Sequence, residues 1–242
     1  MLQILIKEVN SFLNSLIAYI VICVFLTGIG LLMWVFPDTN VLDYEFADMD
    51  TLFSLGPYVF LFLIPAITMR LFSEEKKSGT LELLLTRPLT DMQIILGKYF
   101  SGLLVVIFAL IPTVIYYFTL YKLGSPEGNI DSAGVIGSYI GLILLGALFT
   151  SIGVFSSAIT ENQIIAFIIA VFLCFFLYVG FDSIASIDIW GGSAVMLEQL
   201  GIIYHYNALS RGLVDLRDVV YFISMIALML LLTNLILGSR KW

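Results

Sequence analysis

Few side chains in this 242-residue sequence could do chemistry, and their spacing matches no common catalytic or metal-binding motif. The single histidine, His205, lies between two tyrosines. A metal site needs several protein ligands, so we expect His205 to pack at a membrane interface instead. Cys23 and Cys174 both lie in long apolar runs, which predicts buried free thiols rather than a disulfide.

Nucleotide binding and nucleophilic catalysis also lack a recognisable motif. The dipeptide Gly97-Lys98 is followed by Tyr99 and lacks the earlier glycine of a phosphate-binding loop. The motifs G-x-S-x-G and H-E-x-x-H do not occur. The chain is therefore predicted not to be an enzyme, with no catalytic, cofactor-binding or metal-binding residues of its own.

The most informative spacing lies in segment 72–100, FSEEKKSGTLELLLTRPLTDMQIILGKYF. We expect a short helix at 79–86, because Pro88 prevents it from continuing into the next helix. Thr90 and Gln93 have the T-x-x-Q spacing of a capping box, which predicts that a new helix begins there. The segment is thus predicted to hold an ordered helix followed by a fixed corner.

Three leucines of this short helix, Leu81, Leu84 and Leu85, are predicted to face the cytoplasm. A charged loop that only supports topology would account for Lys76 and Lys77, but not for exposed leucines. Exposed apolar helix faces usually mark a partner site. We therefore expect this helix to dock on another protein.

The composition of the chain indicates what kind of elements surround this segment. The chain is 60% hydrophobic and only 12% charged, whereas soluble domains carry about 25% charged residues. So apolar a chain could not cover its surface in water, which excludes an ordinary soluble enzyme. Disorder is excluded too, because disordered segments have low hydrophobicity.

Six charge-free runs are each long enough for a helix across the bilayer, which needs about 20 apolar residues. They are apolar on all sides, which favours helices over the alternating strands of a β-barrel. We therefore predict an all-α polytopic membrane protein, one transmembrane domain over 1–242 with a coupling loop at 73–91. Its spans are expected at about 16–36, 51–72, 92–120, 133–158, 163–181 and 219–237.

Other elements surround these spans. Residues 1–15 have an apolar face that includes Ile4 and Phe12, which predicts an elbow helix lying in the interface. Segment 182–218 is too long for a turn and too apolar for a free loop, so re-entrant or surface-lying helices are expected before the last span.

Two further spacings carry predictions. The spacing Gly137-x-x-x-Gly141 allows close helix packing, either within the chain or between copies. The T-x-x-Q spacing recurs at Thr160 and Gln163, which predicts a second capping box.

Lysine and arginine fall mainly on one side of the predicted spans. With the N-terminus inside, eight lie on the cytoplasmic side and three on the outer side, which places both termini in the cytoplasm. The acidic residues crowd the outer loop at 37–50. No basic patch is present that would bind nucleic acid.

A family resemblance follows from the short helix and its flanks. The run Glu74-Glu75-Lys76-Lys77-Ser78-Gly79-Thr80-Leu81-Glu82-Leu83-Leu84, followed by Pro88-Leu89-Thr90 and Gly97-Lys98, resembles the signature of type-2 ABC exporter permeases. In that family the motif forms a coupling helix between spans two and three, which docks on an ATPase subunit. The segment 204–222 is similar to one subgroup, the gliding-motility-associated ABC permease subunit.

The resemblance implies a set of roles. The ATPase-docking residues would be Glu75, Gly79, Thr80, Leu81, Glu82, Leu84, Leu85 and Pro88, with Thr90 and Gln93 at the helix corner. The chain would be a bacterial inner-membrane permease that works as a homodimer or heterodimer. Its partner ABC ATPase would bind ATP and Mg, and the process would be gliding motility or secretion.

Two other functions stay open on the residues alone. One is a membrane anchor or scaffold of a motility or secretion assembly that moves no substrate. The other is an ion-coupled carrier. No ionisable residue lies in the central third of any predicted span, which weighs against the carrier, because such proteins usually bind the coupling ion there.

Overall fold

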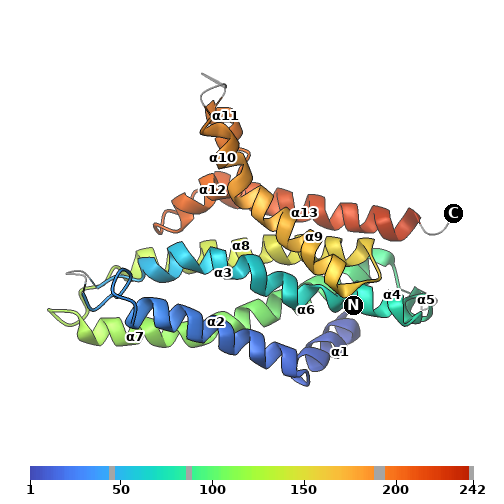
Figure 1. Cartoon of the computed structure of the whole chain (residues 1–242), viewed down its shortest axis with the longest axis horizontal. Helices are drawn as coiled ribbons and strands as arrows, with labels where there is room; N and C mark the ends of the chain where they lie inside the picture. The colour runs from blue at the N-terminus through green and yellow to red at the C-terminus, as the bar shows by residue number, and fades with distance from the viewer. Residues whose placement is uncertain (44–46, 86–88, 188–193, 240–242) are drawn as a thin grey trace.

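The computed structural model describes residues 1–43, 47–85, 89–187 and 194–239, without the side chains of residues 17 and 83–85. All regular elements in these ranges are helices (Figure 1). In chain order, the first are α1 (Leu2–Leu13), α2 (Leu16–Trp34), α3 (Asp50–Thr68), α4 (Arg70–Lys77), α5 (Thr80–Leu85), α6 (Asp91–Leu110) and α7 (Val114–Leu123). They are followed by α8 (Ser132–Ile159), α9 (Gln163–Phe175), α10 (Phe181–Ala185), α11 (Ala194–Glu198), α12 (Ile202–Leu209) and α13 (Leu216–Gly238).

The membrane-spanning pattern agrees with the apolar runs of the sequence. Among the described residues, five helical stretches are long and apolar enough to cross a membrane: Asp50–Lys77, Asp91–Leu123, Ser132–Ile159, Gln163–Ala185 and Leu216–Gly238. Helices α1 and α2 together form a sixth candidate, bent by 67° at the break between them. The predicted all-α polytopic fold is therefore confirmed, and the bend separates the expected elbow helix from the first span.

Helix boundaries extend further than the charge-free runs at several places. The stretch Asp50–Lys77 continues through Lys77, although residues 73–77 were predicted to lie in the loop. Contacts with α8 explain this extension, because the Ser157 hydroxyl accepts the N–H groups of Phe72 and Ser73 at 2.9 and 3.0 Å. Lys76 donates to the carbonyl of Ala158, at the end of α8 where a cation is favoured by the helix dipole.

Helix α8 lies at the centre of the bundle. It is 78% buried over its most apolar window, against 22% for α9 and for α13. A Cβ atom added at Gly153 would lie 1.9 Å from Oγ1 of Thr68 in α3, and one at Gly137 would lie 2.5 Å from the Gly212 carbonyl oxygen. The small residues of α8 therefore bring helices of the same chain into close contact, which selects the first of the two readings of Gly137-x-x-x-Gly141.

Two local predictions are wrong. The second T-x-x-Q spacing does not form a capping box, because Asn162 caps α9 by accepting the Ile164 N–H at 2.9 Å. The Thr160 hydroxyl accepts the N–H of Asn162 instead. Cys174 is buried as expected, but Cys23 is exposed on the surface of α2.

Three short helices lie in the described part of the segment before the last span. Figure 1 shows α10 and α11 projecting away from the long bundle, whereas α12 packs on α8 and α13. The buried Tyr206 hydroxyl of α12 donates to the Phe53 carbonyl at 2.6 Å, and burial raises the pKa of Tyr206. A neutral hydroxyl thus ties α12 to the start of α3.

Candidate functional site

The junction between α4 and α5 is a tight, internally bonded turn. The N–H groups of Ser78 and Gly79 donate to the carbonyls of Glu74 and Lys76, which ends α4. Gly79 has a φ of +69°, a left-handed conformation that glycine adopts without strain. The hydroxyls of Ser78 and Thr80 lie 2.8 Å apart across the turn. The chain is thereby turned sharply into the short helix α5.

The side chains of α5 face in different directions. Leu81 is buried, so the prediction that it faces the cytoplasm is wrong; it packs into the core and anchors α5 to the rest of the chain. Glu82 is exposed. The side chains of Leu84 and Leu85, and all of Pro88, lie outside the described residues.

The carboxylate of Glu75 does not face outwards. Its side chain is only 12% exposed, and its two oxygens lie 2.8 Å from Nζ of Lys7 and 2.9 Å from Nζ of Lys98. Glu8 of α1 adds a second carboxylate, 2.9 Å from the same Lys98 nitrogen. We call these four residues, Lys7, Glu8, Glu75 and Lys98, the ionic cluster.

Lys98 is the centre of the ionic cluster. Its side chain has no exposed surface, whereas that of Lys7 is 60% exposed. Besides the two carboxylates, the Lys98 ammonium donates to the Leu71 carbonyl at 2.5 Å. Two carboxylates and two ammonium groups leave the cluster formally neutral, and a buried charge is tolerated only when paired in this way.

The cluster joins three helices because α1 lies on α6. Ile4, Glu8 and Phe12 are the buried residues of α1, and their spacing of four places them on one face. Gly97 permits the close approach, since a Cβ atom there would lie 3.1 Å from Ile4. The cluster therefore links the elbow α1, the stem α4 of the short helix, and the first turns of α6.

The start of α6 is fixed by its own cap. The Thr90 side chain accepts the Gln93 N–H and the Gln93 side chain accepts the Thr90 N–H, both at 3.3 Å. The predicted capping box is confirmed. Helix α6 therefore starts at a defined residue seven positions before the buried lysine.

Comparison with protein-family models matches residues 40–240 to the ABC-2 family transporter proteins. The chain belongs to the ABC-2 transporter family. No match was found among the curated proteins. Membership makes the chain a multi-pass membrane permease component of an ABC transporter, and it implies an ABC ATPase subunit as partner.

The match places most of the site within the ABC-2 region of the chain. It covers α4, α5 and α6, with Glu75 and Lys98, but it begins after α1 and α2. Helix α1 therefore supplies Lys7 and Glu8 from outside the matched region. In this ABC-2 chain, half of the ionic cluster comes from a segment that the family model does not cover.

From the sequence, Glu75 was expected among the docking residues, and no role was predicted for Glu8 or for the Lys98 side chain. The structure turns Glu75 and Leu81 inwards, towards the rest of this ABC-2 chain. Glu8 carried a readable signal, because it shares the four-residue spacing of Ile4 and Phe12. An acid on an apolar helix face indicates a buried cation nearby.

Proposed function

We propose that this ABC-2 chain is the transmembrane subunit of a bacterial exporter, driven by a separate ATPase subunit that docks on the segment 79–86. That partner would bind the ATP and Mg, for which this sequence has no phosphate-binding loop. The observation that carries the proposal is the link from α5 through Glu75 to Lys98 and Glu8. Force applied to α5 would reach the third span and the elbow together.

Each connection between α5 and α6 is held rigidly. Gly79 and the Ser78–Thr80 contact define the turn, and Leu81 holds α5 to the core. Glu75 lies in the last turn of α4 and is held by two lysines. A push on α5 therefore moves α4 and the start of α6 as one body, since packed elements transmit displacement without much compression.

Docking is tested by changing Leu84 to aspartate. If Leu84 enters a cleft on the ATPase, Leu84→Asp should leave the permease inserted but lower its affinity for the partner at least tenfold, with loss of co-purification. Burying one leucine contributes about 1.5–3 kcal/mol, and a buried unpaired carboxylate costs more; each 1.4 kcal/mol is about tenfold. Leu42→Asp, an exposed position in the loop after α2, is the matched control. Normal co-purification of Leu84→Asp would place the docking surface elsewhere.

Transport is tested separately from docking. Reconstituted vesicles that hold the permease and its ATPase should show ATP hydrolysis stimulated by substrate. Hydrolysis that no compound stimulates would indicate a scaffold, and transport without ATP would indicate an ion-coupled carrier. ATP hydrolysis by the purified chain alone would overturn the division of labour.

The proposal also covers the orientation of the chain in the membrane and its assembly into a dimer. In a variant without Cys23 and Cys174, a cysteine at Asp48 should be labelled only from outside and one at Lys77 only from the cytoplasm. The reverse labelling would invert the topology. We further propose a dimer of two permease chains, homodimeric or heterodimeric, which cross-linking of the purified complex would detect.

We propose, as the most specific statement about function, that the transporter takes part in gliding motility or secretion. This link is supported by the similarity of segment 204–222 to the gliding-motility subgroup. Deletion of the gene in a gliding host should abolish movement, and the Leu84→Asp variant should fail to restore it. Normal gliding and normal secretion in the deletion strain would refute the link to these processes.

A further inference from the structure

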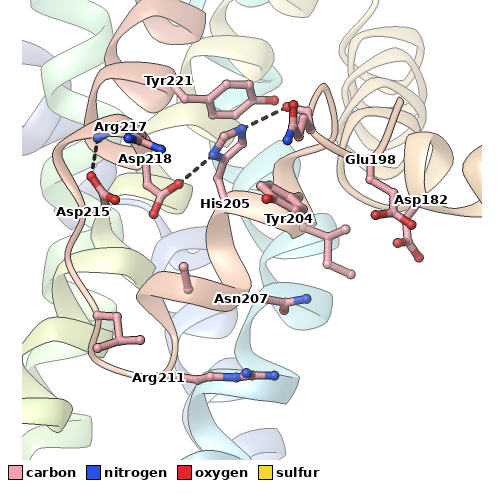
Figure 2. A pocket seen from close by; sticks show the side chains of 14 residues that line it. Asp182, Glu198, Tyr204, His205, Asn207, Arg211, Asp215, Arg217, Asp218 and Tyr221 are labelled. Carbon is pink, nitrogen blue, oxygen red and sulfur yellow. Dashed lines mark hydrogen bonds and ion pairs between the residues drawn. The ribbon is translucent and has the colours of Figure 1, made fainter. Parts of the chain in front are cut away.

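A polar cavity of about 960 Å³ lies between α10, α11, α12 and the start of α13. Figure 1 shows α10, α11 and α12 away from the end of the bundle that holds α4 and α5, and Figure 2 shows the cavity from close by. Its volume is within the range of small-molecule sites. All of its lining residues carry polar side chains except Ile203, Ala208 and Leu213. Such a lining suits a hydrogen-bonding ligand and not an acyl chain.

One wall of the cavity is already saturated with internal contacts. Nδ1 of His205 lies 2.7 Å from the Asp218 carboxylate, and Nε2 lies 2.9 Å from the Gln199 carbonyl oxygen. The Tyr221 ring stacks on the imidazole at 3.9 Å and donates its hydroxyl to the Leu200 carbonyl at 2.7 Å. These groups hold the α11–α12 turn against α13 and give the cavity a fixed wall, in accord with the expected packing role of His205.

Apart from Asp215, whose carboxylate accepts the Arg217 N–H at 2.9 Å, the remaining charged groups of the lining are two acids and two arginines. Asp182 and Glu198 come from α10 and α11, which pack together, and Figure 2 shows both carboxylates on one side of the cavity. Arg211 follows α12, and Arg217 lies in the first turn of α13. Figure 2 shows the two arginines apart from each other, with Arg217 beside Asp215. Within the described part of the chain, none of these four side chains has a hydrogen-bond or ion-pair partner. The cavity thus offers two unpaired acids on one side and, away from them, two unpaired guanidinium groups at separate places.

A ligand that pairs with both the unpaired acids and an unpaired arginine must itself carry both charges. An ammonium group would be held by the two carboxylates beside the exposed Tyr204 ring. A phosphate would be held by arginine, whose planar donors match its oxygens. A purely anionic or purely cationic ligand would leave one set of charges unpaired.

We propose that this cavity binds a zwitterionic aminophosphate group of the phosphoethanolamine type. The group could come from a phospholipid or from a water-soluble compound, and the chemistry of recognition is the same. The proposal does not depend on ATPase docking, because every residue it uses lies outside the segment 79–86.

Calorimetry on the purified chain in a sugar-headed detergent tests the proposal. Glycerophosphoethanolamine is the probe, with glycerol 3-phosphate and ethanolamine as the two half-ligands. We expect the zwitterion to bind at least tenfold more tightly than either half. Absence of binding, or equal binding of glycerol 3-phosphate, would overturn the assignment.

Variants assign the two ends of the ligand. The double variant Asp182→Asn, Glu198→Gln should lower affinity for the zwitterion to that for glycerol 3-phosphate, and Arg211→Gln should lower it to that for ethanolamine. Glu127→Gln and Lys122→Gln, exposed outside the cavity, should leave binding unchanged. Folding of each variant is checked by its melting temperature. Unchanged affinity in folded cavity variants would also refute the site.

Nanodiscs then identify the source of the ligand. In phosphatidylglycerol discs the soluble probe should bind. If phosphatidylethanolamine discs abolish that binding, the lipid headgroup already fills the cavity; undiminished binding assigns the site to a water-soluble aminophosphate.

Discussion

Replacing Lys98 with methionine removes the centre of the ionic cluster while nearly keeping the side-chain volume. The Lys98 side chain has no exposed surface, and its two carboxylate partners are only 11% and 12% exposed. Breaking a buried pair by removing one partner costs about 3–5 kcal/mol. Lys7 would still hold Glu75 at 2.8 Å, so we expect the lower end, a loss of about 3 kcal/mol in unfolding free energy.

Lys7→Met is the matched control in the same cluster. Its side chain is 60% exposed, and exposed ion pairs contribute about 0–1 kcal/mol. Unfolding by SDS titration in mixed micelles would measure both losses. Adding Glu8→Gln and Glu75→Gln to Lys98→Met should recover most of the stability, because no unpaired charge then remains buried. Equal losses in Lys98→Met and Lys7→Met would refute the buried cluster as the anchor of α4.

Three further outcomes are expected, each measured by the same titration. Gly153→Ala should lower the free energy of unfolding by about 1–3 kcal/mol, because the new Cβ would meet Thr68. Gly28→Ala should not lower it, because a Cβ there would have nothing within 4 Å. Equal effects of the two changes would refute the close α3–α8 contact. Thr90→Ala should cost about 1 kcal/mol, and Thr160→Ala less than about half of that, because only Thr90 is an N-cap; the reverse order would contradict the capping assignment. Tyr206→Phe should cost about 1–3 kcal/mol by leaving the buried Phe53 carbonyl without its donor, and an unaffected protein would show that water replaces the hydroxyl.

The fold was predictable because hydrophobic runs of bilayer length have few alternatives to a helix in lipid. The helix boundaries were less predictable than the fold, because they depend on tertiary contacts. Residues 73–77 are charged and look like a loop, yet Ser157 of α8 accepts the amides of Phe72 and Ser73 and supports the helix. The two T-x-x-Q spacings are equivalent in sequence, but the α8–α9 turn places Asn162, not Thr160, at the cap.

The candidate site was predictable where it depends on neighbours in the chain. Thr90 and Gln93 are three residues apart, and their box is a local structure. The partners of Lys98 lie 90 residues away in α1 and on α4, and nothing local in the sequence pairs them. The predicted exposure of Leu81 was wrong for the same reason, because the direction that the Gly79 turn gives to α5 decides which face of that helix is buried.

Helix α1 also affects the order in which the charges of this protein become available. Glu8 precedes Lys98 by 90 residues, and ribosomes add residues from the N-terminus. The carboxylate that neutralises the buried lysine is therefore made well before the helix that carries it. A lone lysine is costly within a bilayer. The Glu8 carboxylate of the elbow is therefore available as a counter-ion before α6 inserts. Cutting off α1 would leave α6 to enter the membrane without it.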